Sequence, residues 1–208
     1  MKQRELFLQA DAALRCVIDR LTPEQLDLPA PATWSRVPQP RLWDIVADHA
    51  RDEAWVPAVL DGRTIEEVGT EFPTNLLGND APSDDPLGDY LITKYDRLND
   101  IATVAVREDL DPERVVHLSY GDYPLREYLL HVSCYRAFQS WTIARLAGLD
   151  FTLPGELVEN LWDQIVPRVD EWRQMGVFEP PVEVPAGADR ETQLLGLTGF
   201  WTPSRATD

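Results

Sequence analysis

The chain has 208 residues, 44% of them hydrophobic, and carries 36 acidic against 19 basic side chains, for a formal net charge of −17. This length and apolar content suit one folded domain, or one domain with a small appendage, and exclude a disordered chain. A surface so acidic would repel phosphate backbones and anionic lipids, so we expect neither nucleic acid nor a membrane as a partner. A small molecule, or a second copy of the chain in a homodimer, is the expected partner.

The sequence also indicates a compartment. It contains no apolar run long enough to cross a bilayer and no basic-then-apolar leader at its start. Its two cysteines, Cys16 and Cys134, are too few for a disulfide scaffold. Both fall within predicted helices, where we expect them to be buried apolar residues. Together these features predict a cytoplasmic protein.

Four long helices are predicted from apolar residues that recur with helical spacing. After the first comes Thr22-Pro23-Glu24-Gln25, a capping box with proline at the first helical position. Residues 61–84, rich in glycine and proline, are expected to form a long loop with at most a short helix. The four helices are expected at residues 4–21, 41–60 and 86–106, and from near 122–124 to 148.

Beyond the fourth helix the sequence predicts a small C-terminal extension. It contains a helical segment over about 154–175, an extended proline-bounded stretch over 177–185 and a short helix around 189–197. We therefore predict an all-α fold, with a four-helix bundle over residues 1–150 and the extension 151–208 packed on it.

Motifs of several enzyme classes are absent, namely a Gly-rich phosphate loop, a G-x-S-x-G elbow, paired CxxC motifs and H-E-x-x-H. The remaining place for a site is the bundle core, where inward polar groups could gather. His49 lies on the apolar face of the second predicted helix, with Glu53 one turn further along. This spacing is compatible with a buried histidine that donates to the glutamate, and also with a pair of metal ligands.

The fourth predicted helix carries Glu127, His131 and Tyr135 at intervals of four residues, which places them on one face. An acid and a histidine one turn apart are half of a metal site, but zinc requires three or four ligands, so His49 would have to supply another. Glu127 also lies in the first turn, where a carboxylate favours the helix dipole without any further role. His117 is expected to be a surface residue in a loop.

Several segments together resemble one known family, the actinobacterial mycothiol-dependent maleylpyruvate isomerase group of the DinB/YfiT-like superfamily. The resemblance runs over nearly the whole chain from about residue 20. In chain order, the segments are 54-AWVPAVLDGRTIEEVG-69, 75-NLLGND-80, 116-VHLSYGDYPLREYL-129, 144-ARLAGLDFTLP-154, 172-WRQMGVFEPPVEVPAGAD-189 and Leu194-Leu195-Gly196.

The resemblance implies a DinB/YfiT-like four-helix bundle with long crossover loops and a divalent metal, zinc or nickel, held at one end. In that family the ligands are a histidine on the second helix and an acid-x-x-x-His pair on the fourth. The metal activates a thiol cofactor such as mycothiol for isomerisation or S-transfer, since coordination deprotonates the thiol. The implied activity is therefore that of a thiol-dependent isomerase or S-transferase.

The family's ligand positions fall on weaker ligands in this chain. The second-helix histidine corresponds to Asp48, and the acid and histidine of the fourth helix correspond to Tyr135 and Gln139, with Thr142 at the position of a following aspartate. His131 falls eight residues, roughly 12 Å along a helix, before the family's histidine. Asp48 suits a hard cation, but the set offers nothing for zinc or nickel. We therefore predict a degenerate metal site.

Two rearrangements would restore metal binding: a one-residue slip that turns His49 inward, or a site rebuilt around His49 and Glu53. Three functions follow from these observations. The first is a metal-dependent thiol enzyme. The third is a structural role, in which the tryptophan side chains only pack in the core. The second is a metal-free protein that binds a small ligand in a cavity lined by Asp48, Tyr135, Arg136 and Gln139. We expect a family member with a reduced or lost metal site.

Overall fold

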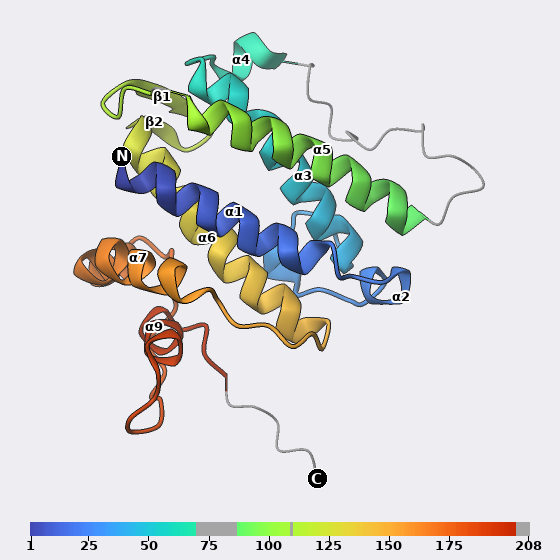
Figure 1. Ribbon diagram of the computed structural model, residues 1–208, viewed down its shortest axis with the longest axis vertical. Coiled ribbons are helices and arrows are strands. Elements are labelled where there is room, and N and C mark those ends of the chain that lie inside the picture. Colours follow the sequence, from blue (N-terminus) through green and yellow to red (C-terminus); the bar gives the residue numbers. More distant parts are fainter. Residues whose placement is uncertain (70–86, 109, 203–208) are drawn as a thin grey trace. The chain divides into compact units, whose positions relative to one another are not determined.

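The computed structural model describes residues 1–69, 87–108 and 110–202, and most of these residues are helical (Figure 1). The predominantly helical character predicted from the sequence is therefore confirmed. The chain divides into two compact units, Met1–Phe151 and Thr152–Asp208.

Four long helices make up most of the described part of the first unit. All lie where the sequence predicts helices, because their apolar residues recur every three or four positions and form a buried face. They are α1 (Lys2–Ile18), α3 (Leu42–Leu60), α5 (Leu87–Arg107) and α6 (Leu125–Leu146).

Side-chain caps fix where two short helices begin. At α2 (Pro23–Leu26) the Thr22 hydroxyl accepts from the Gln25 backbone N–H, while the Gln25 side chain accepts from the Thr22 N–H, as predicted. The same reciprocal pair, Thr64 with Glu67, begins α4 (Ile65–Val68). Each cap stabilises its turn by about 1 kcal/mol. Helix α4 is the short helix expected in the long loop, and residues 70–84 of that loop lie outside the described residues.

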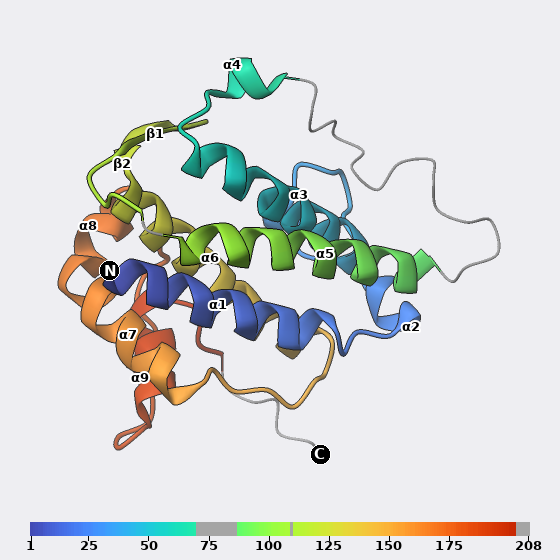
Figure 2. The same ribbon diagram turned by 45° about the horizontal axis from the view of Figure 1, so that its top comes forward.

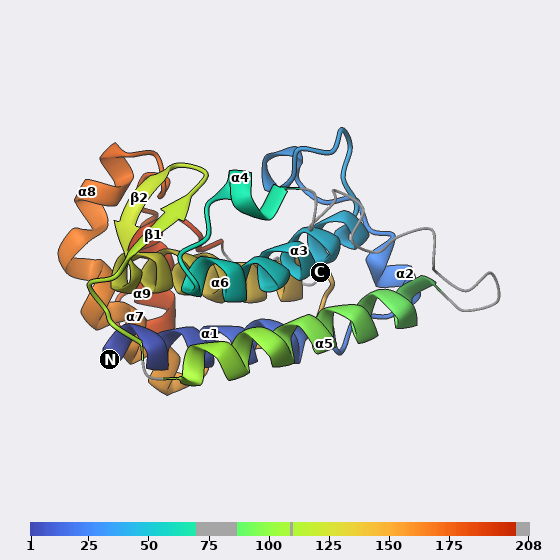
Figure 3. The same cartoon turned by 90° about the horizontal axis from the view of Figure 1, so that it is seen from above.

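The long helices pack in a specific order. Helix α1 lies beside both α5 and α6, and α3 packs along α5, as the views in Figures 2 and 3 agree. The backbones of α3 and α6 stay further apart than these pairs. Because α3 and α6 are separated, side chains from both can reach into the space between them.

Two apolar clusters fill the first unit. One gathers side chains from α1, α2, α3, α5 and α6, and includes Leu14, Ile18, Leu42, Ile45 and Ile143. The other gathers side chains from α1, α3, α5, α6 and the segment before α6, and includes Phe7, Val56, Val106, Val116 and Leu129. Of the two cysteines, Cys134 is buried as predicted, whereas Cys16 is exposed, so its predicted burial was wrong.

A β-hairpin precedes α6, where the sequence predicts only a loop. Strand β1 (Val115–Leu118) pairs antiparallel with β2 (Gly121–Pro124), and Val116 lies opposite Tyr123. Val116 is fully buried and anchors the hairpin in the apolar core. His117, predicted as a surface loop residue, is instead part of β1 and pairs through Nδ1 with Asp122 at 2.8 Å.

The second unit contains α7 (Gly155–Ile165), α8 (Val169–Gln174) and α9 (Arg190–Thr198). The single helical segment predicted over 154–175 is interrupted by a 3₁₀ turn at Val166–Arg168. Pro167 lies inside that turn, and its missing N–H cannot continue an α-helical hydrogen-bond ladder.

Within the second unit, the extended segment before α9 lies directly against that helix. The Val182 N–H donates to the Gly196 carbonyl at 2.9 Å. A Cβ at position 196 would lie 2.5 Å from Val184 Cγ1, so only glycine permits this approach. In the part of the chain that the structure describes, none of the helices combines the length and apolar character needed to cross a membrane.

Candidate functional site

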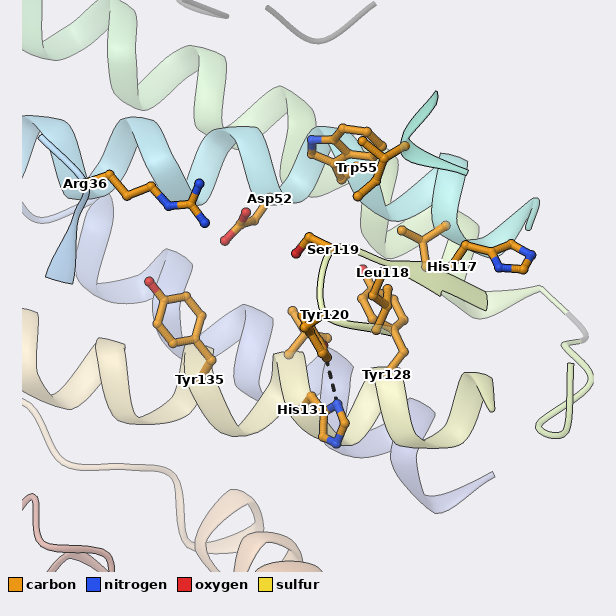
Figure 4. A pocket seen from close by; sticks show the side chains of 13 residues that line it. Arg36, Asp52, Trp55, His117, Leu118, Ser119, Tyr120, Tyr128, His131 and Tyr135 are labelled. Atoms are coloured by element: carbon orange, nitrogen blue, oxygen red, sulfur yellow. Dashed lines mark hydrogen bonds between the residues drawn. The ribbon is translucent and has the colours of Figure 1, made fainter. Parts of the chain in front are cut away.

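A cavity of about 460 Å³ opens between α3, α6 and the hairpin (Figure 4). Such a volume suits a small organic molecule. Its aromatic lining consists of Trp55, Tyr120, Tyr128 and Tyr135. Its polar lining consists of Arg36, Asp52, His117, Ser119 and His131, and aliphatic side chains complete the wall.

Asp52 is the carboxylate that opens into this cavity. It comes from α3 and points toward the space above Tyr135 in Figure 4. Within the described residues, Asp52 makes no hydrogen bond and no ion pair within 4 Å. Surrounding protein desolvates the carboxyl group and raises its pKa to about 6, with Asp48 adding to the rise and the charges of Arg136 and Arg51 opposing it. The carboxylate is therefore open to solvent through the cavity but crowded by protein on its other sides.

Three phenols surround Asp52. Desolvation raises the pKa of Tyr120 to about 12, and raises the pKa values of Tyr128 and Tyr135 as well. The negative charge of Asp52 contributes to all three shifts, which places each ring within its electrostatic reach. The phenols therefore stay neutral and present ring faces and hydroxyls, not phenolates, to anything in the cavity.

His131 lies on the α6 side of the cavity, together with the glutamate predicted to share its face. Its Nε2 is 3.9 Å from Glu127 Oε2, and its Nδ1 is 3.4 Å from the Tyr120 hydroxyl. The Tyr123 ring meets the imidazole edge-on, with centroids 5.2 Å apart. Glu127 and His131 are thus brought together as the sequence predicts, and tyrosines of the hairpin lie against His131.

Behind the cavity wall, a buried ionic network joins α1, α3, α5 and α6. Arg136 on α6 is 1% exposed, and its guanidinium lies 2.6 Å from Asp11 Oδ1 and 3.0 Å from Glu53 Oε2. Asp11 also accepts from Asn99 at 2.8 Å and from Thr103 at 3.1 Å. Asp11 is therefore the better satisfied carboxylate, and burial followed by the charge of Asp11 raises the pKa of Glu53 well above its ordinary value, against the opposing charge of Arg136.

His49 is buried next to this network. Neither of its ring nitrogens makes a hydrogen bond within the described residues, and the Tyr135 ring lies against it with centroids 5.2 Å apart. Burial and then the charge of Arg136 lower the pKa of His49 to about 3. The Gln139 side chain lies near enough to oppose this shift without reaching hydrogen-bond geometry, and its own Oε1 lacks a partner. His49 is therefore a neutral imidazole.

The residues at the family's ligand positions do not fit a divalent metal. Asp48 accepts from Ser35 Oγ and from Arg51 Nη1, each at 2.8 Å, and does not line the cavity. Thr142 donates to backbone carbonyls of its own helix. Tyr135 is a neutral phenol at the cavity wall and Gln139 is a neutral amide behind it.

A site rebuilt around His49 and Glu53 fits no better. Glu53 is already paired with Arg136, whose positive charge would oppose a metal ion at His49. Among residues 1–69, 87–108 and 110–202, no group of three or more His, Cys, Asp or Glu side chains is placed to hold a metal. Only a neutral imidazole remains available there, which is too little for zinc.

The sequence prediction missed the residue that dominates the cavity. Asp52 follows Asp48 by one turn and precedes Trp55 by three residues, so the three share a helix face. That face is the signal that was available. The prediction followed the neighbouring, more apolar face through His49 and Glu53, which leads to the buried network instead.

Replacement of Asp52 by asparagine is expected to stabilise the fold slightly at neutral and higher pH, since water reaches the exposed side chain and weakens the penalty on its charge. A carboxyl whose folded-state pKa is raised lowers stability once it is ionised, so the wild type loses stability as pH rises through about 6, and the variant does not. The gain in Tm should shrink toward zero near pH 4, where the ordinary carboxyl is protonated as well. Thermal unfolding across this pH range measures the difference in Tm between the variant and the wild type. Asp163→Asn, at an exposed position, is the control for the loss of one negative charge. Equal gains in both variants would contradict the desolvation of Asp52.

Comparisons with protein-family models, with curated proteins and with solved structures found no match to this chain. The function must therefore be argued from the cavity itself.

Proposed function

We propose that the chain is a DinB/YfiT-like four-helix bundle protein of the mycothiol-dependent maleylpyruvate isomerase-like group that has lost its metal site and binds a small molecule. The ligand site is the cavity between α3, α6 and the hairpin. The observation that carries the proposal is a roomy cavity with an unpartnered carboxylate and aromatic walls. Behind it, the guanidinium of Arg136 is paired with Asp11 and Glu53 in the bundle interior.

The buried network explains how a metal could be dispensed with. A divalent ion at the end of a bundle neutralises inward carboxylates, and here Asp11 and Glu53 share the single positive charge of Arg136. A guanidinium cannot activate a thiol as a metal does, because it forms no bond to sulfur. The proposal therefore excludes thiol activation by this network and leaves ligand binding as the role of the adjacent cavity.

A metal-dependent thiol isomerase or S-transferase is the second candidate. The observation in its favour is His49, whose two unpartnered ring nitrogens lie beside the unpartnered Gln139 oxygen. Metal content separates the two candidates. The protein, expressed without an affinity tag and exposed to zinc, nickel and manganese, should hold well below one equivalent of each by mass spectrometry. A stoichiometric metal that is lost in His49→Ala would overturn the metal-free proposal.

Ligand binding is tested by filling the cavity. Val132 lines it from α6, so Val132→Trp should abolish binding of fragments found by ligand-detected NMR. Val177→Trp adds the same side chain at an exposed position in the second unit and should leave binding unchanged. Fragments that bind both variants equally well do not occupy this cavity, and that result would contradict the proposed site.

A further inference from the structure

One carboxylate, Asp52, lies among the aromatic side chains of the cavity, and the inference drawn from it rests on the proposed function. Asp52 projects from α3 into the space above Tyr135 of α6, with the Arg36 side chain reaching into the same space, while Tyr120 lies further along the cavity (Figure 4). Trp55 lies on the same helix face as Asp52, one turn further along. A negative charge with neutral ring faces around it is an environment that favours a cation.

Among the described residues, no cation lies within 4 Å of the Asp52 carboxylate. The two nearest α3 and α6 cations are committed elsewhere: Arg51 donates to Asp48 at 2.8 Å, and Arg136 is buried between Asp11 and Glu53. Arg36, which also lines the cavity, is exposed and makes no ion pair with Asp52 among the described residues. An entering cation would therefore meet a free carboxylate in a partly desolvated space, where an ion pair is stronger than at an open surface.

We infer that the cavity takes an organic cation, a primary or quaternary ammonium ion on an aromatic or aliphatic body, with the ammonium between Asp52 and the rings of Tyr135 and Tyr120. The body of the ligand lies against Trp55 and the aliphatic wall. Neutral phenols accept a cation over their faces, and Asp52 supplies a negative charge beside them. The net charge of −17 on the whole chain also favours the arrival of cations.

Three compounds of similar size separate the cation from other ligands: 2-phenylethylamine, 2-phenylethanol and 3-phenylpropionate. By isothermal titration calorimetry at neutral pH, the amine is expected to bind ~tenfold or more tightly than the alcohol, from an ion pair and a cation–π contact together. The carboxylate should bind more weakly than the alcohol. An amine that binds no better than the alcohol would overturn the inference while leaving the small-molecule site intact.

Two variants test whether Asp52 causes the preference for the amine over the alcohol. Asp52→Asn should bring amine affinity down to that of the alcohol, while the alcohol affinity itself stays unchanged. Asp163→Asn, which removes the same charge from an exposed position on α7, should retain the full preference. Loss of the preference in both variants would assign it to net charge and overturn the role of Asp52. Absence of binding by all three compounds, together with no fragment displaced by Val132→Trp, would overturn both the inference and the proposed function.

Discussion

Replacement of Arg136 by methionine is expected to lower the free energy of unfolding by about 3–5 kcal/mol, since it leaves two buried carboxylates without their counter-ion. The guanidinium is 1% exposed, lies 2.6 Å from Asp11 Oδ1 and 3.0 Å from Glu53 Oε2, and neither acid can reach bulk water instead. Urea unfolding followed by tryptophan fluorescence measures the loss. It is a large share of the ~5–15 kcal/mol that a folded domain has.

The pH dependence of this loss identifies its cause. Without the guanidinium, Glu53 can remove one of the two buried negative charges by taking up a proton, and burial already raises its pKa well above the ordinary value. The variant should therefore be less destabilised at about pH 5 than at about pH 8. The triple variant Arg136→Met, Asp11→Asn, Glu53→Gln removes every charge and should recover most of the lost stability at both pH values.

Arg126→Met provides the matched control. Arg126 lies on the same helix and pairs with Glu113, but this pair is largely exposed, and exposed pairs contribute about 0–1 kcal/mol. Similar losses for Arg136→Met and Arg126→Met would contradict the special cost of the buried network.

Replacement of Phe7 by alanine is expected to cost about 3–5 kcal/mol, because it empties a fully buried position at the junction of core and network. The Phe7 ring belongs to the apolar cluster around Leu129, and the Arg136 guanidinium carbon lies 4.6 Å from its centroid. The ring therefore packs over the guanidinium that holds the two carboxylates. Urea unfolding followed by tryptophan fluorescence measures this loss as well.

Phe7→Leu separates volume from the ring. Leucine refills much of the space but offers no aromatic face, so the loss should fall to about 1–2 kcal/mol. Leu8→Ala, at the next and only partly buried position of α1, should cost less than Phe7→Ala. A loss at Leu8 as large as that at Phe7 would indicate general weakness of α1 and not a specific role of the ring.

The helices were predictable from sequence because each buries one face, and the resulting periodicity extends over five or six turns. The hairpin was not, since each of its strands has four residues and Val116 is the single fully buried one. Its turn, Ser119-Tyr120, also lacks the Asn-Gly or Asp-Gly pair that marks a two-residue hairpin turn. A strand pair this short leaves almost no pattern to detect.

The site shows a different limit. Sequence spacing identified Arg136 and Glu53 as inward polar residues, and both are buried. It could not identify Asp11, the principal partner of Arg136, because the two are 125 residues apart and only tertiary packing brings them together. Without that partner Arg136 was predicted to line a ligand cavity, whereas it lies behind the cavity wall. Asp52 is the carboxylate that does line the cavity. It was overlooked because the prediction followed the helix face of the neighbouring Glu53.

In the hairpin, mostly different residues contribute to the core and to the ligand cavity. Four consecutive residues, His117 to Tyr120, contribute side chains to the cavity, while Val116 and, in part, Leu118 pack against the core. Exchanging the turn residues Ser119 and Tyr120 would therefore alter which ligands fit while leaving the core contacts of Val116 and Leu118 in place. The molecule thus has the organisation of an antibody domain on a small scale, a constant framework with one replaceable loop that selects what is bound.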